Sequence, residues 1–178
     1  MSKAKDQLFK IAKAGECSSL SGKSSLNYQI GYDGQSNIYF RVTANSGGGW
    51  FSGDWVSMQV IQSALDKAPT PLTSYALQIL FKGKSVNTPA FLFAALKQEG
   101  LVSTDPNNPR CYLATATDDF MSRMHQVIAA GIDLKFDAKV TGKGMVKAKR
   151  TADVIPVIST SSSSKIKPIK SQLNANIA

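Results

Sequence analysis

Two parts of the chain alternate between apolar and polar residues with a period of two, the pattern of a strand with one buried face. In residues 25–44, two alternating runs flank the polar turn 33–36, which predicts a β-hairpin. In residues 132–150, the alternation runs from Ile132 to Val140 and reaches a turn with two glycines at 141–144. We therefore predict a second hairpin there.

Other segments have the helical period. Residues 3–14 place Leu8, Ile11 and Ala12 on one face, which predicts a short amphipathic helix that ends at Gly15. Residues 54–99 predict three helices separated by proline and glycine. A loop at 103–109, a strand at 110–115 and a helix that Thr117 caps, ending at Gly131, complete the pattern.

The three helices of residues 54–99 have separate start and stop signals. The first has Ser52 or Asp54 as its expected cap. The second turns Tyr75 and Ile79 to an apolar face and ends near residues 82–83. In the third, Thr88 is the expected cap, Pro89 follows as the first helical residue and Gly100 ends the helix.

These elements predict an α+β fold in which antiparallel hairpins pack with four or five short helices. We expect residues 1–158 to form one globular domain, with hairpins at 25–44 and 132–150 and a helical segment at 54–99. From residue 159 the sequence is rich in serine with spaced lysines, so we predict a disordered basic tail over 159–178.

Composition narrows the class of protein. With 178 residues, 43% of them hydrophobic, the chain can bury a core. No apolar run is long enough to cross a membrane and no secretory signal is evident, so we predict a cytoplasmic protein without a membrane partner. Cys17 and Cys111 are far apart, which predicts two buried free thiols and neither a disulfide framework nor a cysteine metal site.

No enzyme motif is complete in the sequence. Two Gly-Lys-Ser triplets, at 22–24 and 83–85, lack the preceding glycine of a phosphate-binding P-loop, because Cys17 and Gln78 stand at that position. The single histidine, His125, has no carboxylate or thiol at helical spacing, so we predict a partly buried structural residue. We predict no enzymatic activity, no cofactor and no metal.

The helical segment and the residues after it resemble the winged-helix family. The helices of 54–99 are followed by the phrase Leu96-Lys97-Gln98-Glu99-Gly100-Leu101-Val102, a loop and a strand, like the helices and two-stranded wing of that family. The resemblance implies a DNA-binding topology. One difference is that residues 88–96 are apolar nearly all round, which predicts a buried helix instead of one that reads base edges.

The glycine-rich bend at 45–49 and the aromatic residues beside it allow two interpretations. The glycines either present backbone N–H groups to an anion or let the hairpin turn onto the next helix. Trp50, Phe51 and Trp55 either belong to the core or serve as a stacking surface or partner anchor.

Charge is unevenly distributed. The net charge is +9, of which residues 131–178 contribute +6 and residues 1–130 contribute +3. We predict that these cations bind phosphates, of DNA more than RNA, although lysines that guard an edge strand would give the same pattern. The predicted nucleic-acid contacts are Arg41, Lys139, Lys143, Lys147, Lys149 and Arg150.

The first functional hypothesis is therefore a small basic accessory protein that binds nucleic acid without catalysis. The alternative is a protein interaction module, such as an adaptor, an inhibitor or an assembly subunit, that uses the aromatic glycine-rich loop as its anchor. The small size, the missing catalytic motifs and the basic tail are also typical of an accessory protein of a phage or plasmid.

Overall fold

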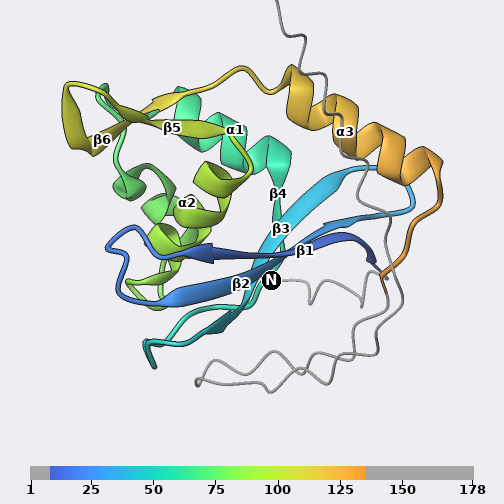
Figure 1. The fold of residues 1–178 in the computed structure, drawn as a ribbon, viewed down its shortest axis with the longest axis horizontal. Helices are drawn as coiled ribbons and strands as arrows, with labels where there is room; N and C mark the ends of the chain where they lie inside the picture. Colours follow the sequence, from blue (N-terminus) through green and yellow to red (C-terminus); the bar gives the residue numbers. More distant parts are fainter. Residues whose placement is uncertain (1–8, 135–178) are drawn as a thin grey trace, which may run out of the picture. The chain divides into compact units, whose positions relative to one another are not determined.

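A four-stranded antiparallel sheet carries the fold (Figure 1). The computed structural model describes residues 9–134. The strands lie in the order β1-β2-β3-β4, and the helices lie on one side of the sheet together with a two-stranded β5-β6 ladder (Figure 1). The elements are β1 (Lys10–Ser18), β2 (Ser25–Tyr32), β3 (Ile38–Asn45), β4 (Val56–Ser57), α1 (Met58–Asp66), the 3₁₀ helix η1 (Ser74–Phe81), α2 (Thr88–Gln98), β5 (Val102–Asp105), β6 (Asn108–Ala114) and α3 (Asp118–Ala129). The predicted α+β class with antiparallel strands and four helices is confirmed for the described residues.

The predicted hairpin at 25–44 is present as β2 and β3. Tyr28 pairs with Val42 and Ile30 pairs with Phe40, and these side chains are buried against the helices. The turn is held by Asp33, whose Oδ1 accepts the backbone N–H groups of Gln35 (2.8 Å) and Asn37 (3.0 Å). An aspartate that bonds the backbone two residues on is a standard turn former, which explains why the polar residues 33–36 reverse the chain.

The helix predicted at 3–14 is wrong for the part that the structure describes, because residues 10–18 form strand β1. This strand pairs with β2 from Lys10 to Ser18. Gly15 fits there because a Cβ atom would lie 2.5 Å from the hydroxyl oxygen of Tyr28. A helix of this length is marginal in isolation, whereas the strand satisfies its backbone groups along β2 and buries Cys17.

Helix α1 begins later than predicted. Val56 and Ser57 pair with β3 as the short strand β4, so Ser57 is the cap, and its Oγ accepts the N–H of Val60 at 3.3 Å. The predicted caps Ser52 and Asp54 are therefore wrong. The second predicted helix is the 3₁₀ helix η1, in which Leu77 and Phe81 are the buried residues. Tyr75 and Ile79, predicted to face the core, are exposed.

Helix α2 is the central helix, and its residues Leu92 to Leu96 are all buried. This confirms that the apolar segment 88–96 is not a surface helix. Thr88 is the first helical residue instead of the cap, and its Oγ1 accepts the N–H of Ser52 at 2.9 Å. Gly100 ends the helix with a φ of 79°.

The chain after α2 forms the β5-β6 ladder. Val102 pairs with Ala114, so the predicted strand at 110–115 is confirmed as part of β6. The predicted loop at 103–109 is wrong in part, because its first residues belong to β5 and pair with β6. Thr104 is a residue type enriched in strands, and the pairing of Ser103 with Leu113 and of Thr104 with Tyr112 places both residues in β5.

Helix α3 covers the far end of the sheet and starts with the acidic first turn that the sequence predicts. Phe120 stacks on Phe40, with ring centroids 5.6 Å apart. The chain then returns to β1, where the N–H of Leu134 donates to the Ile11 carbonyl oxygen at 2.8 Å. Residues 132–134, the start of the predicted hairpin 132–150, are not in a strand, and the rest of that hairpin and the predicted tail 159–178 lie outside the described residues.

Candidate functional site

The outer face of the sheet, opposite the helices, carries a cluster of three aromatic rings and an arginine. Tyr39 and Arg41 alternate with the buried Phe40 along β3, so they lie on this face. The ring centroid of Phe9 lies 4.7 Å from that of Tyr39 and 4.8 Å from that of Trp55. The Arg41 guanidinium carbon lies 4.4 Å from the Trp55 ring centroid. We refer to Phe9, Tyr39, Arg41 and Trp55 as the outer-face cluster.

Strand β2 provides the floor of the outer-face cluster. Gly31 pairs with Tyr39, and a Cβ atom at Gly31 would lie 2.7 Å from the Trp55 ring. Only a residue without a side chain lets the indole lie this close to the sheet. The neighbouring Gln29 is buried, and it pairs with Arg41 across the strands. The two positions of β2 that face outward are therefore adapted to the aromatic ring and the guanidinium above them.

Arg41 is held by its partner on β2. Its Nε and Nη2 both donate to Gln29 Oε1, at 2.9 and 2.7 Å. Burial lowers the pKa of Arg41, but an arginine stays protonated in proteins and keeps its positive charge at neutral pH. Within residues 9–134, its Nη1 has no hydrogen-bond partner. The guanidinium therefore combines a fixed position with a free donor.

The structure separates the three aromatic residues that the sequence groups together. Trp55 belongs to the outer-face cluster, whereas Phe51 is buried and contributes to the interior. Trp50 is 58% exposed, and its carbonyl oxygen accepts the hydroxyl of Ser85 at 2.5 Å and the Asn87 amide at 3.4 Å. Of the predicted anchor residues, Trp50 alone presents most of its side chain at the surface.

The glycine-rich bend is organised by Asn45, which is buried. Its side chain accepts the N–H of Gly47 at 3.0 Å and donates to the carbonyl oxygen of Gly49 at 3.1 Å. Gly48 has a φ of 71°, which favours glycine. The pKa of Asp54 is lowered by a hydrogen bond from Ser52 and by the nearby positive charge of Lys84. The bend thus has the geometry expected from the interpretation in which the glycines turn the chain.

A buried carboxylate that sequence reasoning missed joins three elements. Lys13 Nζ lies 2.8 Å from Glu99 Oε1 and 2.9 Å from Oε2, and the Tyr28 hydroxyl donates to Oε1. The Glu99 side chain is only 1% exposed. Burial and Glu99 raise the pKa of Tyr28. The only sequence signal is a carboxylate at the end of a helix that is otherwise almost entirely apolar.

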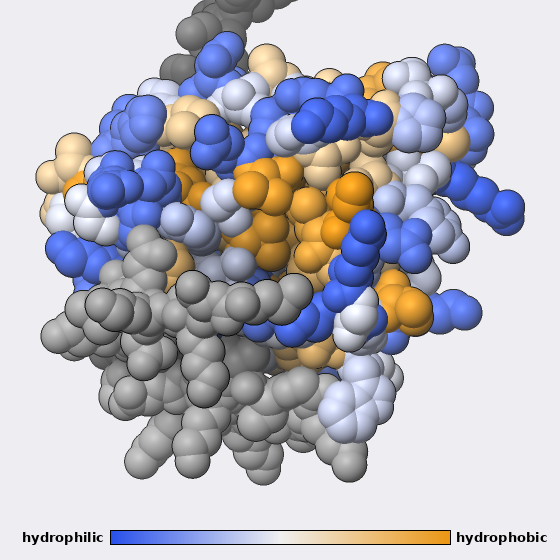
Figure 2. Space-filling view, turned by 180° about the vertical axis from the view of Figure 1, so that it is seen from behind, coloured by the Kyte–Doolittle hydropathy of each residue, from blue (hydrophilic) through white to orange (hydrophobic). Residues whose placement is uncertain are grey.

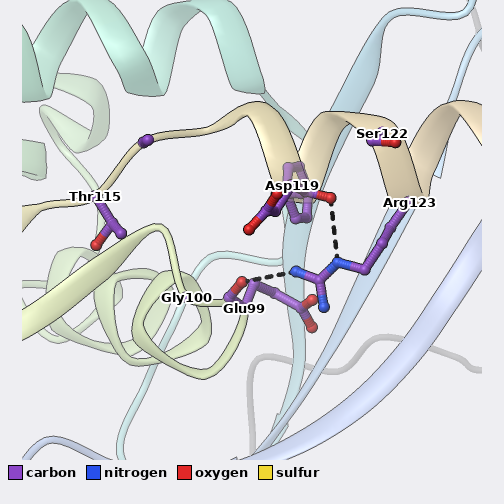
Figure 3. A pocket seen from close by; sticks show the side chains of 8 residues that line it. Glu99, Gly100, Thr115, Asp119, Ser122 and Arg123 are labelled. Carbon is purple, nitrogen blue, oxygen red and sulfur yellow. Dashed lines mark hydrogen bonds between the residues drawn. The ribbon is translucent and has the colours of Figure 1, made fainter. Parts of the chain in front are cut away.

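The backbone of Glu99 also ties α2 to α3. Arg123 Nη2 donates to the Glu99 carbonyl oxygen at 3.2 Å, and Nε donates to the Asp119 carbonyl oxygen at 3.4 Å (Figure 3). A hollow of about 510 Å³ lies beside this arginine, and Thr115 and Ser122 are among its lining residues (Figure 3). Because both described hydrogen bonds of Arg123 go to backbone oxygens of the fold, we interpret this arrangement as structural.

Both cysteines are free and buried, as the sequence predicts. Burial, with smaller contributions from Glu99 and Glu16, raises the pKa of the Cys17 thiol to about 11. A thiol with so high a pKa is almost entirely protonated at neutral pH and is a poor nucleophile. Cys17 therefore packs in the hydrophobic core and is not suited to catalysis.

A second hollow, of about 550 Å³, lies between the β2-β3 turn, the start of α1 and α3. We refer to it as the turn pocket. Tyr39 of the outer-face cluster is one of its lining residues, and His125 is another. His125 is exposed, so the prediction of a partly buried histidine is wrong. Its position on α3 turns the ring away from Phe120 and Met124, the residues that α3 buries.

The described residues provide neither a metal centre nor a membrane segment. Among residues 9–134, no three His, Cys, Asp or Glu side chains are grouped to hold a metal ion. None of the described helices combines the length and the apolar character needed to cross a bilayer. The predicted contacts Lys139, Lys143, Lys147, Lys149 and Arg150 lie outside the described residues.

The charge of the described residues is close to zero. Residues 9–134 contain ten Lys or Arg and nine Asp or Glu, a net charge of +1, whereas residues 135–178 contain nine and two, a net charge of +7.

No family model matches the sequence, and no curated protein or solved structure matches it either.

Proposed function

We propose that the protein binds nucleic acid without catalysis, through phosphate contacts made by the cations of residues 135–178. The observation that carries the proposal is the net charge of +7 on residues 135–178, which we call the basic segment. Residues 9–134 have a net charge of only +1. Lys and Arg side chains that neutralise phosphates release condensed counterions, and this release supplies most non-specific affinity. Positive charge that is concentrated in one segment of the chain is the electrostatic footprint expected of a nucleic-acid-binding protein.

The outer-face cluster supports the proposal from the described residues. Aromatic rings and arginine planes are the groups on which unpaired bases stack. Trp55, Tyr39 and Arg41 lie together on one sheet face, and the described chain ends at Leu134, which is bonded to Ile11 on strand β1 of that sheet. Residue 135, the first of the basic segment, directly follows Leu134 in the sequence, and Leu134 is hydrogen-bonded to β1 of this sheet.

The proposal does not include major-groove reading by a winged helix. In that mode a helix presents polar side chains to base edges. Helix α2 instead buries Leu92 to Leu96 within the core. The β5-β6 ladder that follows α2 is in the sequence position of a wing, so the winged-helix topology stays a prediction, and the proposed contacts are to phosphates and unpaired bases.

Binding should depend on salt and on Trp55. We expect the affinity for a labelled single-stranded oligonucleotide to fall linearly on a log-log salt plot, with a slope of about −0.7 per phosphate contact. Trp55→Leu should weaken single-strand binding about 5- to 150-fold, since one stacked base contributes ~1–3 kcal/mol, and should change duplex binding little. Fluorescence anisotropy with DNA and RNA, single-stranded and duplex, measures both effects.

Trp50→Leu is the matched control, because it also removes an indole but lies outside the outer-face cluster. Circular dichroism verifies that both variants are folded at the assay temperature. A flat salt response of the wild-type protein would exclude the proposal. Equal losses in the Trp50 and Trp55 variants would exclude the outer-face cluster as the stacking surface.

A second candidate function is binding of a protein partner through Trp50. The exposed indole is attached to a loop whose backbone is fixed by Ser85 and Asn87, and Val86 between them is 83% exposed. Figure 2 shows apolar residues gathered near the middle of the face turned away in Figure 1, bordered by hydrophilic ones. Exposed tryptophans on fixed loops are frequent hot spots of protein interfaces.

The two functions differ in their response to nuclease. If Trp50 is the anchor, a pull-down with the wild-type chain retains a partner after nuclease treatment, and Trp50→Ala reduces its recovery at least about 30-fold, the effect of a ~2 kcal/mol hot spot. Tyr75→Ala removes another exposed aromatic side chain, from η1, and serves as the control. Recovery that is lost with nuclease, or that is equal in the two variants, excludes Trp50 as the anchor.

A further inference from the structure

The turn pocket adjoins the outer-face cluster through Tyr39. The Tyr39 ring contacts Phe9 in the cluster, and Tyr39 is also one of the lining residues of the pocket. The pocket volume of about 550 Å³ lies within the range of about 300–1,000 Å³ that is common for small-molecule sites. The pocket lies toward α1 and α3 and is lined by Ser57 of the edge strand β4, so a group of a strand bound on the outer-face cluster reaches this hollow around that edge, at Tyr39.

The lining of the turn pocket is polar, without a carboxylate, ammonium or guanidinium group. Side-chain amides of Gln59 and Gln62, the imidazole of His125 and several hydroxyls surround it, whereas the apolar contribution comes mainly from Met58 and Met121. No Asp, Glu, Lys or Arg is among its lining residues. A phosphate or a carboxylate would lie there without a positive side chain to pair with, and Asp33 and Asp66 are bonded to the lining residues Asn37 and Gln62, so the lining disfavours an anionic ligand.

The polar groups of the pocket have hydrogen-bonding capacity to offer a ligand. Within residues 9–134, the Gln59 side chain and the His125 ring have no hydrogen-bond partner. Gln62 Nε2 donates to Asp66 at 2.8 Å, which leaves its Oε1 as an acceptor. An amide offers a donor and an acceptor side by side, the pattern that base edges complement. The thioethers of Met58 and Met121 suit the face of an aromatic ring.

We infer that the turn pocket accepts one unstacked nucleobase of a single strand that crosses the outer-face cluster. The inference rests on the proposed nucleic-acid function and names the part of the ligand that this pocket binds. The base is neutral and planar, and its edge carries donors and acceptors, which matches the amides, the imidazole and the thioethers of the lining. The sugar and phosphate stay outside, toward Tyr39 and the cluster.

The chain contains one histidine, so the imidazole protons of His125 report on this pocket alone. We expect adenosine, guanosine, cytidine or thymidine, added to the full-length protein, to shift the His125 proton resonances in a saturable way. Gln59→Leu should weaken the binding of the preferred nucleoside about 2- to 10-fold, the effect of one lost hydrogen bond. Gln78→Leu, on the exposed side of η1, is the matched control and should leave the binding unchanged.

Ribose 5-phosphate and inorganic phosphate test whether the base is the recognised group. A His125 shift of the same size with these compounds, or an equal nucleoside affinity in the wild-type and Gln59→Leu proteins, would overturn the inference. The same resonances are then followed while a single-stranded oligonucleotide is added. Oligonucleotide binding without a change at His125 overturns the base pocket and leaves the proposed function intact, whereas no oligonucleotide binding at low salt overturns both.

Discussion

Replacing Glu99 by alanine is expected to lower the free energy of unfolding by about 3 kcal/mol. The carboxylate is the common partner of Lys13 on β1 and Tyr28 on β2, and it belongs to the residue that ends α2. Its removal leaves the buried Tyr28 hydroxyl without its acceptor, which costs about 1–3 kcal/mol, and also removes the partner of Lys13, whose side chain is 42% exposed. Urea unfolding followed by circular dichroism measures the difference in stability.

Glu16→Ala is the matched control for this prediction. Glu16 is an exposed carboxylate on the same sheet, and it accepts a hydrogen bond from Ser25. We expect its replacement to change stability by no more than about 0.5 kcal/mol, as for most surface positions. Tyr28→Phe should cost less than Glu99→Ala, since Lys13 still balances the carboxylate. Equal stability of the Glu99 and Glu16 variants would contradict the role of Glu99 as a link between the sheet and α2.

The sequence predicts those elements whose pattern is complete within the element. Residues 25–44 carry both alternating runs and the turn-forming Asp33, so the hairpin can be identified without knowledge of its neighbours. Helix α2 is equally well defined, because an apolar segment with proline at its start and Gly100 after its end has few alternatives. In such segments, the residues that form the turn or end the helix lie within the segment or directly beside it.

The errors occur where a distant segment decides the structure. Residues 10–14 fit a helical pattern, but β2 provides a pairing partner for the whole of β1. Ser57 replaces Ser52 and Asp54 as the cap because β4 pairs with β3. In both cases the pairing partner lies elsewhere in the sequence. The local pattern of apolar and polar residues therefore does not predict the pairing.

The candidate site was predictable in its residue types but not in its geometry. The sequence predicts Arg41 and Trp55 as binding residues, and that role stays a prediction; the contact between their side chains depends on the return of the chain from β3 to β4. Phe9 joins them only because β1 is a strand. The small size of Gly31, which lets the indole approach the sheet, has no meaning until the register of β2 and β3 is known.

The largest effect on binding is expected from the basic segment. Replacing Lys143, Lys147, Lys149 and Arg150 together by alanine should lower nucleic-acid affinity about 10²–10³-fold at ~0.1 M salt. Each lost phosphate contact removes about 0.9 from the slope of log affinity against log salt on duplex DNA, so the slope should fall by about 3 to 4. A salt series with the full-length variant measures both quantities, and the measured slope shows how many of the four cations contact phosphate.

A charge-matched variant decides whether position or net charge is responsible. Four exposed cations of the described domain are replaced by alanine in the control, namely Lys23, Lys67, Lys82 and Arg110. Both variants lower the net charge from +9 by four. If residues 135–178 bind the phosphates, the control loses less than about tenfold, because charges farther than a Debye length of ~10 Å from the bound strand are screened. Equal losses in the two variants would mean that binding follows net charge and would refute the assignment to the basic segment.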